Sequence, residues 1–154
     1  MPLVPTTVMT PPREPGPSST VDVVIPSDPA EARRVQDEIE RLLRAHQASE
    51  KDIFGIRLAL EEALVNAIKH GNQMDRSKQV RISYSVGPDR FEVHITDEGP
   101  GFDPEDVPDP TAVENLERPC GRGLMLMRHY MNEVSFNGRG NCVRMAKVLR
   151  NGKK

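Results

Sequence analysis

Three groups of residues in this chain have types and spacings that phosphate and metal chemistry uses. Glu62 and Asn66 lie four residues apart in a segment of helical periodicity, so their side chains share one helix face. At about 100° per residue, Lys69 adds an ammonium group to that face. Such a row could supply a base, a Mg²⁺ ligand and a phosphate contact, because Mg²⁺ prefers oxygen ligands. Taken alone, the row is also typical of an ordinary solvated helix face.

The second group comes at the end of a predicted strand. Asp97 continues the apolar alternation over 91–95, so its carboxylate should point to the covered side of the sheet. A carboxylate in that place needs a hydrogen-bond partner, and an exocyclic amino group would provide one. Gly99 and Gly101 follow and allow a sharp turn or a close approach to a ligand. Without further context, the same pattern also fits an acidic turn.

The third group is Gly121-Arg122-Gly123, directly before a predicted helix with the sequence LMLMRHYM. Free amides at a helix start and flexible glycines can bind phosphate oxygens. Arg118 and Arg122 add cationic groups beside them. A single glycine pair before a helix is equally compatible with ordinary loop structure.

The helices and strands that must position these groups are predicted from hydrophobic periodicity and from capping residues. Polar residues alternate with apolar ones in the strands, and the helices carry apolar stripes that begin after capping residues, Ser27 or Asp28 for the first helix and Ser49 for the second. The expected elements are strands at 21–25, 79–86, 90–97, 133–136 and 142–149, with helices at about 29–47, 49–71 and 122–131. This order predicts an α+β fold, a largely antiparallel sheet with helices on one face. Residues 98–120 contain five prolines and seven acidic residues without a sustained period, which predicts a functional lid.

Composition limits the class of protein. A length of 154 residues fits one domain, and six of the fourteen prolines fall in residues 1–20, so we expect a flexible tail there and a folded domain over 21–150. The net charge of −2 gives no reason to expect nucleic acid as a partner, and no apolar run is long enough for a membrane span. The two cysteines lack zinc-ligand spacing, although one disulfide stays open. A cytoplasmic protein is the simplest expectation.

Together, the motifs in this order are far more specific than any one of them. The runs EALVNAIKHG (62–71), DEGPGFD (97–103), GRGLMLM (121–127) and GNCV (140–143) resemble the ATPase superfamily of gyrase, mismatch-repair and histidine-kinase proteins. Within it, the chain most resembles the small anti-sigma factor serine/threonine kinases. The resemblance covers about residues 20–150 and implies a two-layer α/β sandwich of the Bergerat (histidine kinase-like ATPase) type that binds ATP with Mg²⁺.

The resemblance also implies roles for single residues. Asn66 looks like the Mg²⁺ ligand, and Glu62 looks like the base that orients or deprotonates the attacking hydroxyl. Asp97 is similar to the family aspartate that bonds the adenine amino group, with Gly99 and Gly101 shaping that pocket.

The remaining assignments concern the phosphates and the lid. Gly121 and Gly123 resemble the second glycine box, which contacts phosphates. Arg118 looks like the lid arginine that stabilises transferred charge, and Arg122 competes for that role. Asn141 is assigned near the adenine pocket, where the family often has Thr.

The implied function is a regulatory kinase that passes the γ-phosphoryl group of ATP to a serine or threonine of an anti-anti-sigma protein and sequesters a sigma factor. The subgroup often dimerises, so a homodimer is a further expectation. One alternative is a nucleotide-gated binding module without phosphotransfer. Two others are the catalytic domain of a two-component histidine kinase and a structural protein that binds no nucleotide.

Overall fold

A computed structural model describes residues 20–99, 119–137 and 141–149 of the chain, with residues 119–122 described by their backbone alone. Residues 1–19 of the predicted tail over 1–20, and most of the predicted lid, including Gly101 and Arg118, therefore lie outside the described residues. Cys142 is a free cysteine. No helix in the described ranges is long and apolar enough to cross a membrane.

A five-stranded antiparallel sheet forms one layer of the molecule. Its strands lie in the order β2-β3-β4-β6-β5, so β6 is inserted between β4 and β5. This arrangement confirms the predicted α+β class and the antiparallel sheet. The bounds are β2 Val21–Pro26, β3 Gln79–Val86, β4 Arg90–Thr96, β5 Glu133–Phe136 and β6 Cys142–Val148.

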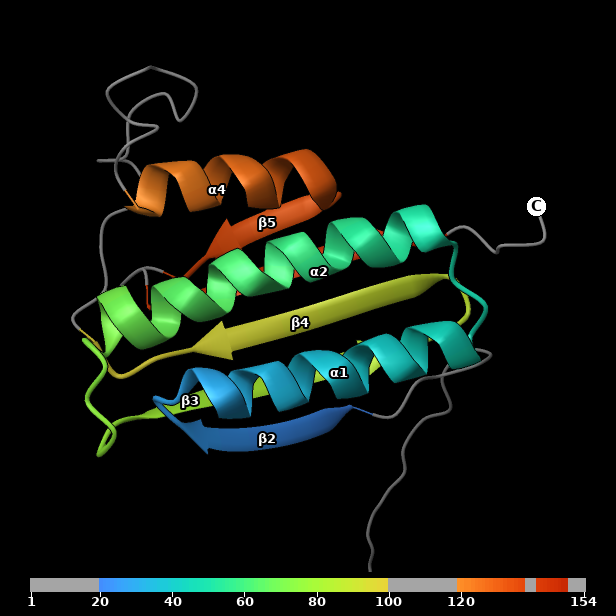
Figure 1. The fold of residues 1–154 in the computed structure, drawn as a ribbon. Helices are drawn as coiled ribbons and strands as arrows, with labels where there is room; N and C mark the ends of the chain where they lie inside the picture. Colours follow the sequence, from blue (N-terminus) through green and yellow to red (C-terminus); the bar gives the residue numbers. More distant parts are fainter. Residues whose placement is uncertain (1–19, 100–118, 138–140, 150–154) are drawn as a thin grey trace, which may run out of the picture.

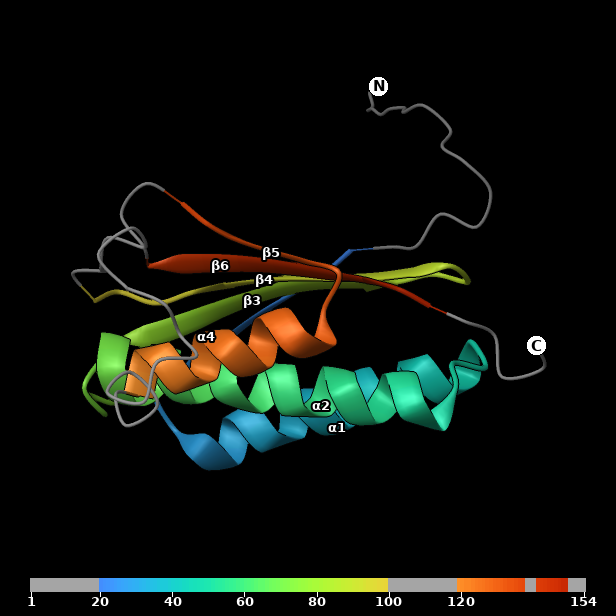
Figure 2. The same ribbon diagram turned by 90° about the horizontal axis from the view of Figure 1, so that it is seen from above.

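The helices form the second layer and all cover the same face of the sheet (Figure 2). In Figure 1, α2 lies in the middle of this layer, with α1 on one side of it and α4 on the other. One-sided coverage explains the alternation in the strands, because only one face of the sheet is packed. The bounds are α1 Pro29–Ala45, α2 Glu50–Val65, a π-helical continuation η1 Asn66–Gly71, and α4 Pro119–Tyr130.

The two long helices begin at side-chain caps. The backbone N–H of Ala30 donates to Asp28 Oδ1 at 3.0 Å, and the N–H of Asp52 donates to Ser49 Oγ at 3.1 Å. Each cap satisfies one of the amides that a helix start leaves without a partner. Ser27, the other candidate cap of α1, is buried and donates instead to the carbonyl of Lys78 at 2.8 Å.

The core lies between the sheet and α2. Phe91, Val93 and Ile95 of the central strand β4 are at most 2% exposed. Burying one such side chain stabilises the fold by roughly 1.5–3 kcal/mol. The apolar stripe predicted for the second helix is buried against them: Ile53, Ile56, Leu60, Ala63, Leu64 and Ala67. The central strand and central helix are thus held rigidly, and both end at the same edge of the molecule (Figure 1).

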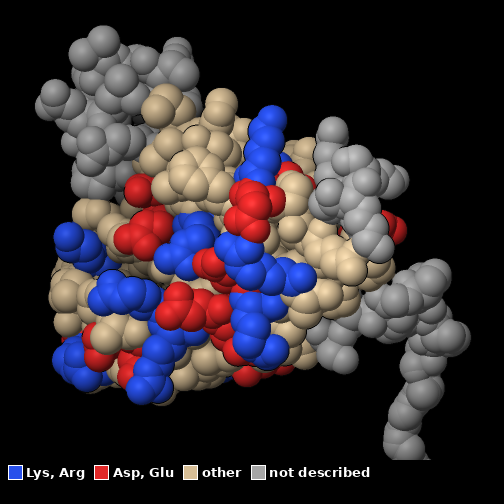
Figure 3. All heavy atoms as spheres, turned by 45° about the vertical axis from the view of Figure 1, so that its right-hand side comes forward, with Lys and Arg blue, Asp and Glu red and all other residues tan. Residues whose placement is uncertain are grey.

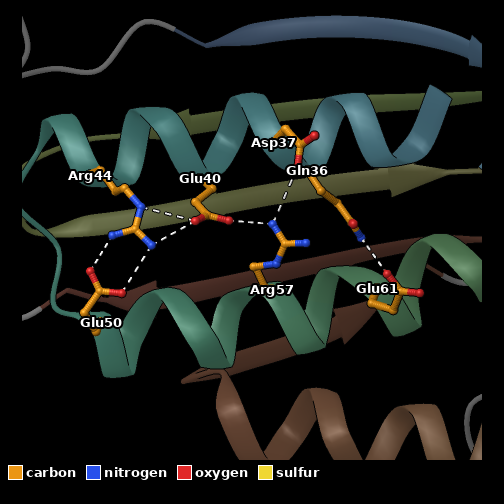
Figure 4. Close-up of polar contacts among 7 residues, drawn as sticks. All are labelled: Gln36, Asp37, Glu40, Arg44, Glu50, Arg57 and Glu61. Carbon is orange, nitrogen blue, oxygen red and sulfur yellow. Dashed lines mark hydrogen bonds and ion pairs between the residues drawn. The ribbon is translucent and has the colours of Figure 1, made fainter. Parts of the chain in front are cut away.

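A network of ion pairs joins α1 to α2 (Figure 4). Glu40 accepts hydrogen bonds from Arg44 at 2.9 Å and from Arg57 at 2.5 Å, and Arg44 also pairs with Glu50. On the face drawn in Figure 3, basic and acidic side chains are interleaved over this region. The described residues on this face form no single-sign patch.

Hydrogen bonds from Arg44 and then Arg57 hold the pKa of Glu40 below its ordinary value of 4.5. A carboxyl whose pKa is lowered on folding stabilises the protein above its unfolded pKa and loses that contribution as the pH falls through the folded pKa. Glu40→Gln should therefore lower the free energy of unfolding at pH 7 by up to about 1 kcal/mol. Urea unfolding from pH 7 to pH 3 should show the difference from the wild type shrinking below about pH 4.5. Glu38→Gln is the control, because Glu38 pairs with Arg41 within α1 alone. A difference that stays constant with pH would contradict the assignment.

Candidate functional site

Four segments that are distant in sequence meet at one edge of the molecule. They are η1, the residues that follow β4, the start of β6 and the first turns of α4, on the left in Figure 1. The strand register brings two of them together, because Thr96 at the end of β4 pairs with Cys142 at the start of β6. All four of the sequence runs, 62–71, 97–103, 121–127 and 140–143, thus contribute described residues to one region.

Glu62 and Asn66 lie against the beginning of α4. A Cβ added to Gly123 would lie 3.0 Å from Asn66 Nδ2 and 3.2 Å from Glu62 Oε1. Gly123 is buried, and the absence of a side chain at this position lets α4 approach the two polar groups. Neither side chain forms a hydrogen bond or ion pair with another described residue. Within the described part of the chain, the site thus holds a half-buried carboxylate and amide without a polar partner.

Asp97 lies directly over the end of η1. Its carboxylate carbon and both oxygens are within 2.6 Å of the position that a Cβ on Gly71 would occupy. The side chain therefore points to the helical side of the sheet, as the alternation of β4 predicts. Asp97 Oδ1 accepts a hydrogen bond of 2.7 Å from the N–H of Gly99. The turn amide thus orients the Asp97 carboxylate toward the end of η1.

Gly99 closes the turn after Asp97 against the same helix end. A Cβ on Gly99 would lie 2.1 Å from the carbonyl oxygen of Gly71. The two backbones are therefore in direct contact, and no side chain fits between them. Gly99 is needed at this position for a close backbone approach, one of the two roles that the sequence suggested.

Asn141, directly before the neighbouring strand β6, supports Asp97. Its carbonyl accepts from the Asp97 N–H at 2.9 Å, and its Nδ2 donates to the Asp97 carbonyl at 3.1 Å. Asn141 Oδ1 in turn accepts from Asn137 Nδ2 at 2.8 Å. The structure thus places Asn141 beside the predicted adenine contact, with its amide holding the backbone that carries Asp97.

The helix that carries Glu62 changes its winding at Asn66. From there to Gly71 it is π-helical, and the N–H of Asn72 donates to the carbonyl of Ala67, five residues back, at 2.9 Å. Such segments are rare and are frequent at functional sites. The wider turns bring Gly71 under Asp97. The sequence predicted the helix end at Gly71 but not this winding.

Lys69 does not join the row of Glu62 and Asn66. The projection at about 100° per residue fails once the π-helix begins, because its turns hold more residues than those of an α-helix. Lys69 is exposed and lines a hollow of about 60 Å³ between α1 and α2, with Arg33 and Gln36 on its far side. No contact between Lys69 and Glu62 or Asn66 is described. The assignment of Lys69 to phosphate binding stays a prediction.

The glycine pair near the lid lies within α4 and not before it. The helix begins at Pro119, about three residues earlier than predicted, so Gly121 and Gly123 are in its first turns. Proline favours the first turn of a helix, since it lacks only an N–H that has no helical partner there. Nothing is described of the Arg122 side chain, and Arg118 and Gly101 lie outside the described residues.

The described residues contain no group of three or more His, Cys, Asp and Glu side chains that could bind a metal ion. The predicted Mg²⁺ ligand Asn66 would thus be combined with oxygens of the ligand itself. This donor set suits Mg²⁺, which binds through few protein ligands and completes its shell with substrate phosphates and water.

Comparison with known proteins places the chain in a family. A family model described as a histidine kinase-like ATPase domain matches residues 25–147. The chain belongs to this family. In the solved structure of the RsbU and RsbW domains of Rv1364c from Mycobacterium tuberculosis, the match has a TM-score of 0.59 and 16% identity, and covers 87% of this chain and 34% of that one. At this identity the match shows the fold alone.

Curated relatives with higher identity are kinases and anti-sigma factors by name. The serine-protein kinase RsbW of Bacillus velezensis is 32% identical, over 86% of this chain and 89% of its own. RsbW of Bacillus subtilis is 34% identical, over 64% of this chain and 66% of its own. An anti-sigma F factor of Clostridium perfringens is 32% identical, over 59% of this chain and 66% of its own. The chain thus spans about two thirds of the latter two proteins.

Proposed function

We propose that the chain is a protein serine/threonine kinase that binds ATP with Mg²⁺ at this edge and acts as an anti-sigma factor in a partner-switching pathway. Its phosphorylation substrate would be an anti-anti-sigma protein, and its sequestered client a sigma factor. The names of the relatives support this assignment. We place the activity in the cytoplasm, where such transcription regulators act, and a homodimer stays a prediction of the family resemblance.

The observation that carries the proposal is the convergence of Glu62 and Asn66 with Gly123, next to Asp97 packed on Gly71. These contacts gather an oxygen ligand for a cation, a carboxylate base and an acceptor for an amino group around one region. Each of these groups matches one part of an ATP molecule in transfer.

In the proposed reaction, Asp97 accepts a hydrogen bond from the adenine amino group, and Asn66 is the side chain that would hold Mg²⁺ beside the triphosphate. Glu62 accepts the proton of the substrate hydroxyl as its oxygen forms a bond to the γ-phosphorus and the bond from that phosphorus to ADP breaks. Mg²⁺, when bound, neutralises charge on the phosphate oxygens. The protein contributes mainly position and electrostatics, as in other phosphoryl transfers.

Calorimetric titration with ATP tests the binding step. Asn66→Ala should weaken ATP binding in Mg²⁺ at least tenfold, a change of about 1.4 kcal/mol, because the only side-chain oxygen proposed for the ion is lost. The same substitution should have little effect when EDTA replaces Mg²⁺. Asn66→Asp retains an oxygen ligand and serves as the control, with Mg²⁺-dependent binding preserved. Equal Mg²⁺-dependent affinities of Asn66→Ala and the wild type would refute the role of Asn66, and a wild type that ignores ATP would refute the proposed function.

A further inference from the structure

Asn72, directly after the π-helix, is the most completely buried polar residue of the described chain. Its exposed fraction is 0%, and its carboxamide makes three hydrogen bonds. Nδ2 donates to Ser27 Oγ and to the carbonyl of Gln79, each at 3.0 Å, while Oδ1 accepts from the N–H of Glu98 at 2.7 Å. One side chain thus joins the end of β2, the start of β3 and the turn after β4.

The bond to Glu98 bears directly on the candidate site, because Glu98 follows Asp97. Gly71 contacts Asp97 and Gly99 through its own backbone, and the next residue along, Asn72, holds Glu98. Two successive residues at the end of η1, Gly71 and Asn72, therefore contact the turn after β4. A second bond, from the N–H of Gln79 to Glu98 Oε2 at 2.6 Å, holds the same turn from β3.

An asparagine suits this position for a chemical reason. The amide group offers two donors and an acceptor in one plane, and here both kinds of group are used. A hydrocarbon side chain would leave the Glu98 N–H and the Gln79 carbonyl without this partner at a part-buried position, which lowers stability. The acceptor faces the turn that carries Asp97, while the donors face β2 and β3. The two halves of the amide can therefore be tested separately.

We infer that Asn72 is a positioning residue for purine selection: through its bond to the Glu98 N–H, it sets the place of the Asp97 carboxylate that would read the adenine amino group. This inference rests on the proposed function. A carboxylate held in place favours adenine, because the exocyclic amino group of adenine donates a hydrogen bond to it. It disfavours guanine, because the carbonyl oxygen at the corresponding position of guanine is an acceptor. A carboxylate that is free to shift loses this discrimination.

The experiment measures the ratio of the dissociation constants of GTP and ATP by calorimetry, together with the melting temperature of each variant. Asn72→Ala should lower the ratio at least tenfold, and Asn72→Asp should keep it within about threefold of wild type, since the carboxylate still accepts from Glu98. Because Asn72→Asp buries a charge opposite the Gln79 carbonyl, it should melt no higher than Asn72→Ala. Asn72→Asp would then be the more selective of the two variants for ATP without being the more stable one.

Ser27→Ala is the matched control, because it removes a bond to the donor side of the same amide and leaves Glu98 untouched. It should lower the melting temperature and preserve the ratio. If Asn72→Ala does not fold, Asn72→Ser replaces it, since the shorter hydroxyl cannot span to Glu98, and the same loss of selectivity is expected.

The inference would be overturned if the ratio of the GTP and ATP dissociation constants in Asn72→Ala or Asn72→Ser equalled that of the wild type. It would also be overturned if the ratio in Asn72→Asp fell as far as in Asn72→Ala or Asn72→Ser. A Ser27→Ala that loses selectivity in proportion to its melting temperature would overturn it as well. In these cases the wild type still binds ATP, whereas a wild type that binds neither nucleotide overturns the proposed function instead.

Discussion

Glu62→Gln should abolish most phosphotransfer while ATP binding stays within about threefold of the wild type. The amide cannot accept the proton of the substrate hydroxyl, and loss of a general base costs about 10²–10⁴-fold in rate. Shape and volume are nearly unchanged, so the contact with Gly123 and the approach of α4 should persist. Transfer of labelled phosphate from ATP to a purified anti-anti-sigma protein, followed in single turnover, measures the effect.

Glu61 provides the control for this substitution. It is the adjacent carboxylate on the same helix, but it faces α1 and accepts from Gln36 Nε2 at 3.2 Å (Figure 4). Glu61→Gln should leave both transfer and ATP affinity unchanged. Transfer that survives in Glu62→Gln would remove Glu62 from the chemistry. A wild type that binds ATP and its partner but transfers nothing would favour the alternative of a nucleotide-gated binding module.

Gly99→Ala should have the largest effect on the folded state of the site. The new methyl group would lie 2.1 Å from the Gly71 carbonyl oxygen and 2.6 Å from its carbon, and both atoms belong to the backbone. Neither can rotate away, so the turn must move off the helix and take Asp97 with it. Overpacking of this kind costs on the order of 3 kcal/mol. Urea unfolding should show that loss, and calorimetry should show ATP binding weakened more than tenfold.

Gly55→Ala is the matched substitution at a second buried glycine. There the added methyl would meet Tyr130 Cδ1 at 2.9 Å, a side-chain atom that can shift. This variant should lose less stability than Gly99→Ala and keep the ATP affinity of the wild type, because Gly55 lies near the other end of α2. Equal behaviour of the two variants would mean that the contact between Gly71 and Gly99 has no special role.

The sequence was sufficient to predict the elements because their signals are local. The alternation in β3 and β4 and the stripe of α2 reflect burial on one side, and Asp28 and Ser49 mark helix starts by the side-chain chemistry of caps. The predicted α+β class with an antiparallel sheet is confirmed. The structure places Glu62 and Asn66 beside Gly123, and Asp97 beside Gly71. The roles that the resemblance implies for these residues stay predictions.

Features that depend on contacts between distant segments could not be predicted. The π-helical winding after Asn66 displaces Lys69 from the face on which regular periodicity placed it. Gly71 looked like a helix stop, yet its lack of a side chain also makes room for Asp97. Asn72 follows a glycine at a helix end, where asparagine is common in turns, so nothing local distinguished its buried amide from an exposed one.

The position of β6 has a consequence for how this protein is made. Although it is the last described strand to be synthesised, β6 enters the sheet beside β4, and Asn141 just before it supplies two of the hydrogen bonds that hold Asp97. A nascent chain on the ribosome in which Asn141 has not yet been synthesised therefore lacks the two hydrogen bonds that hold the backbone of Asp97. ATP binding would then occur only after Asn141 has been synthesised, and it would stabilise only chains that are complete through β6.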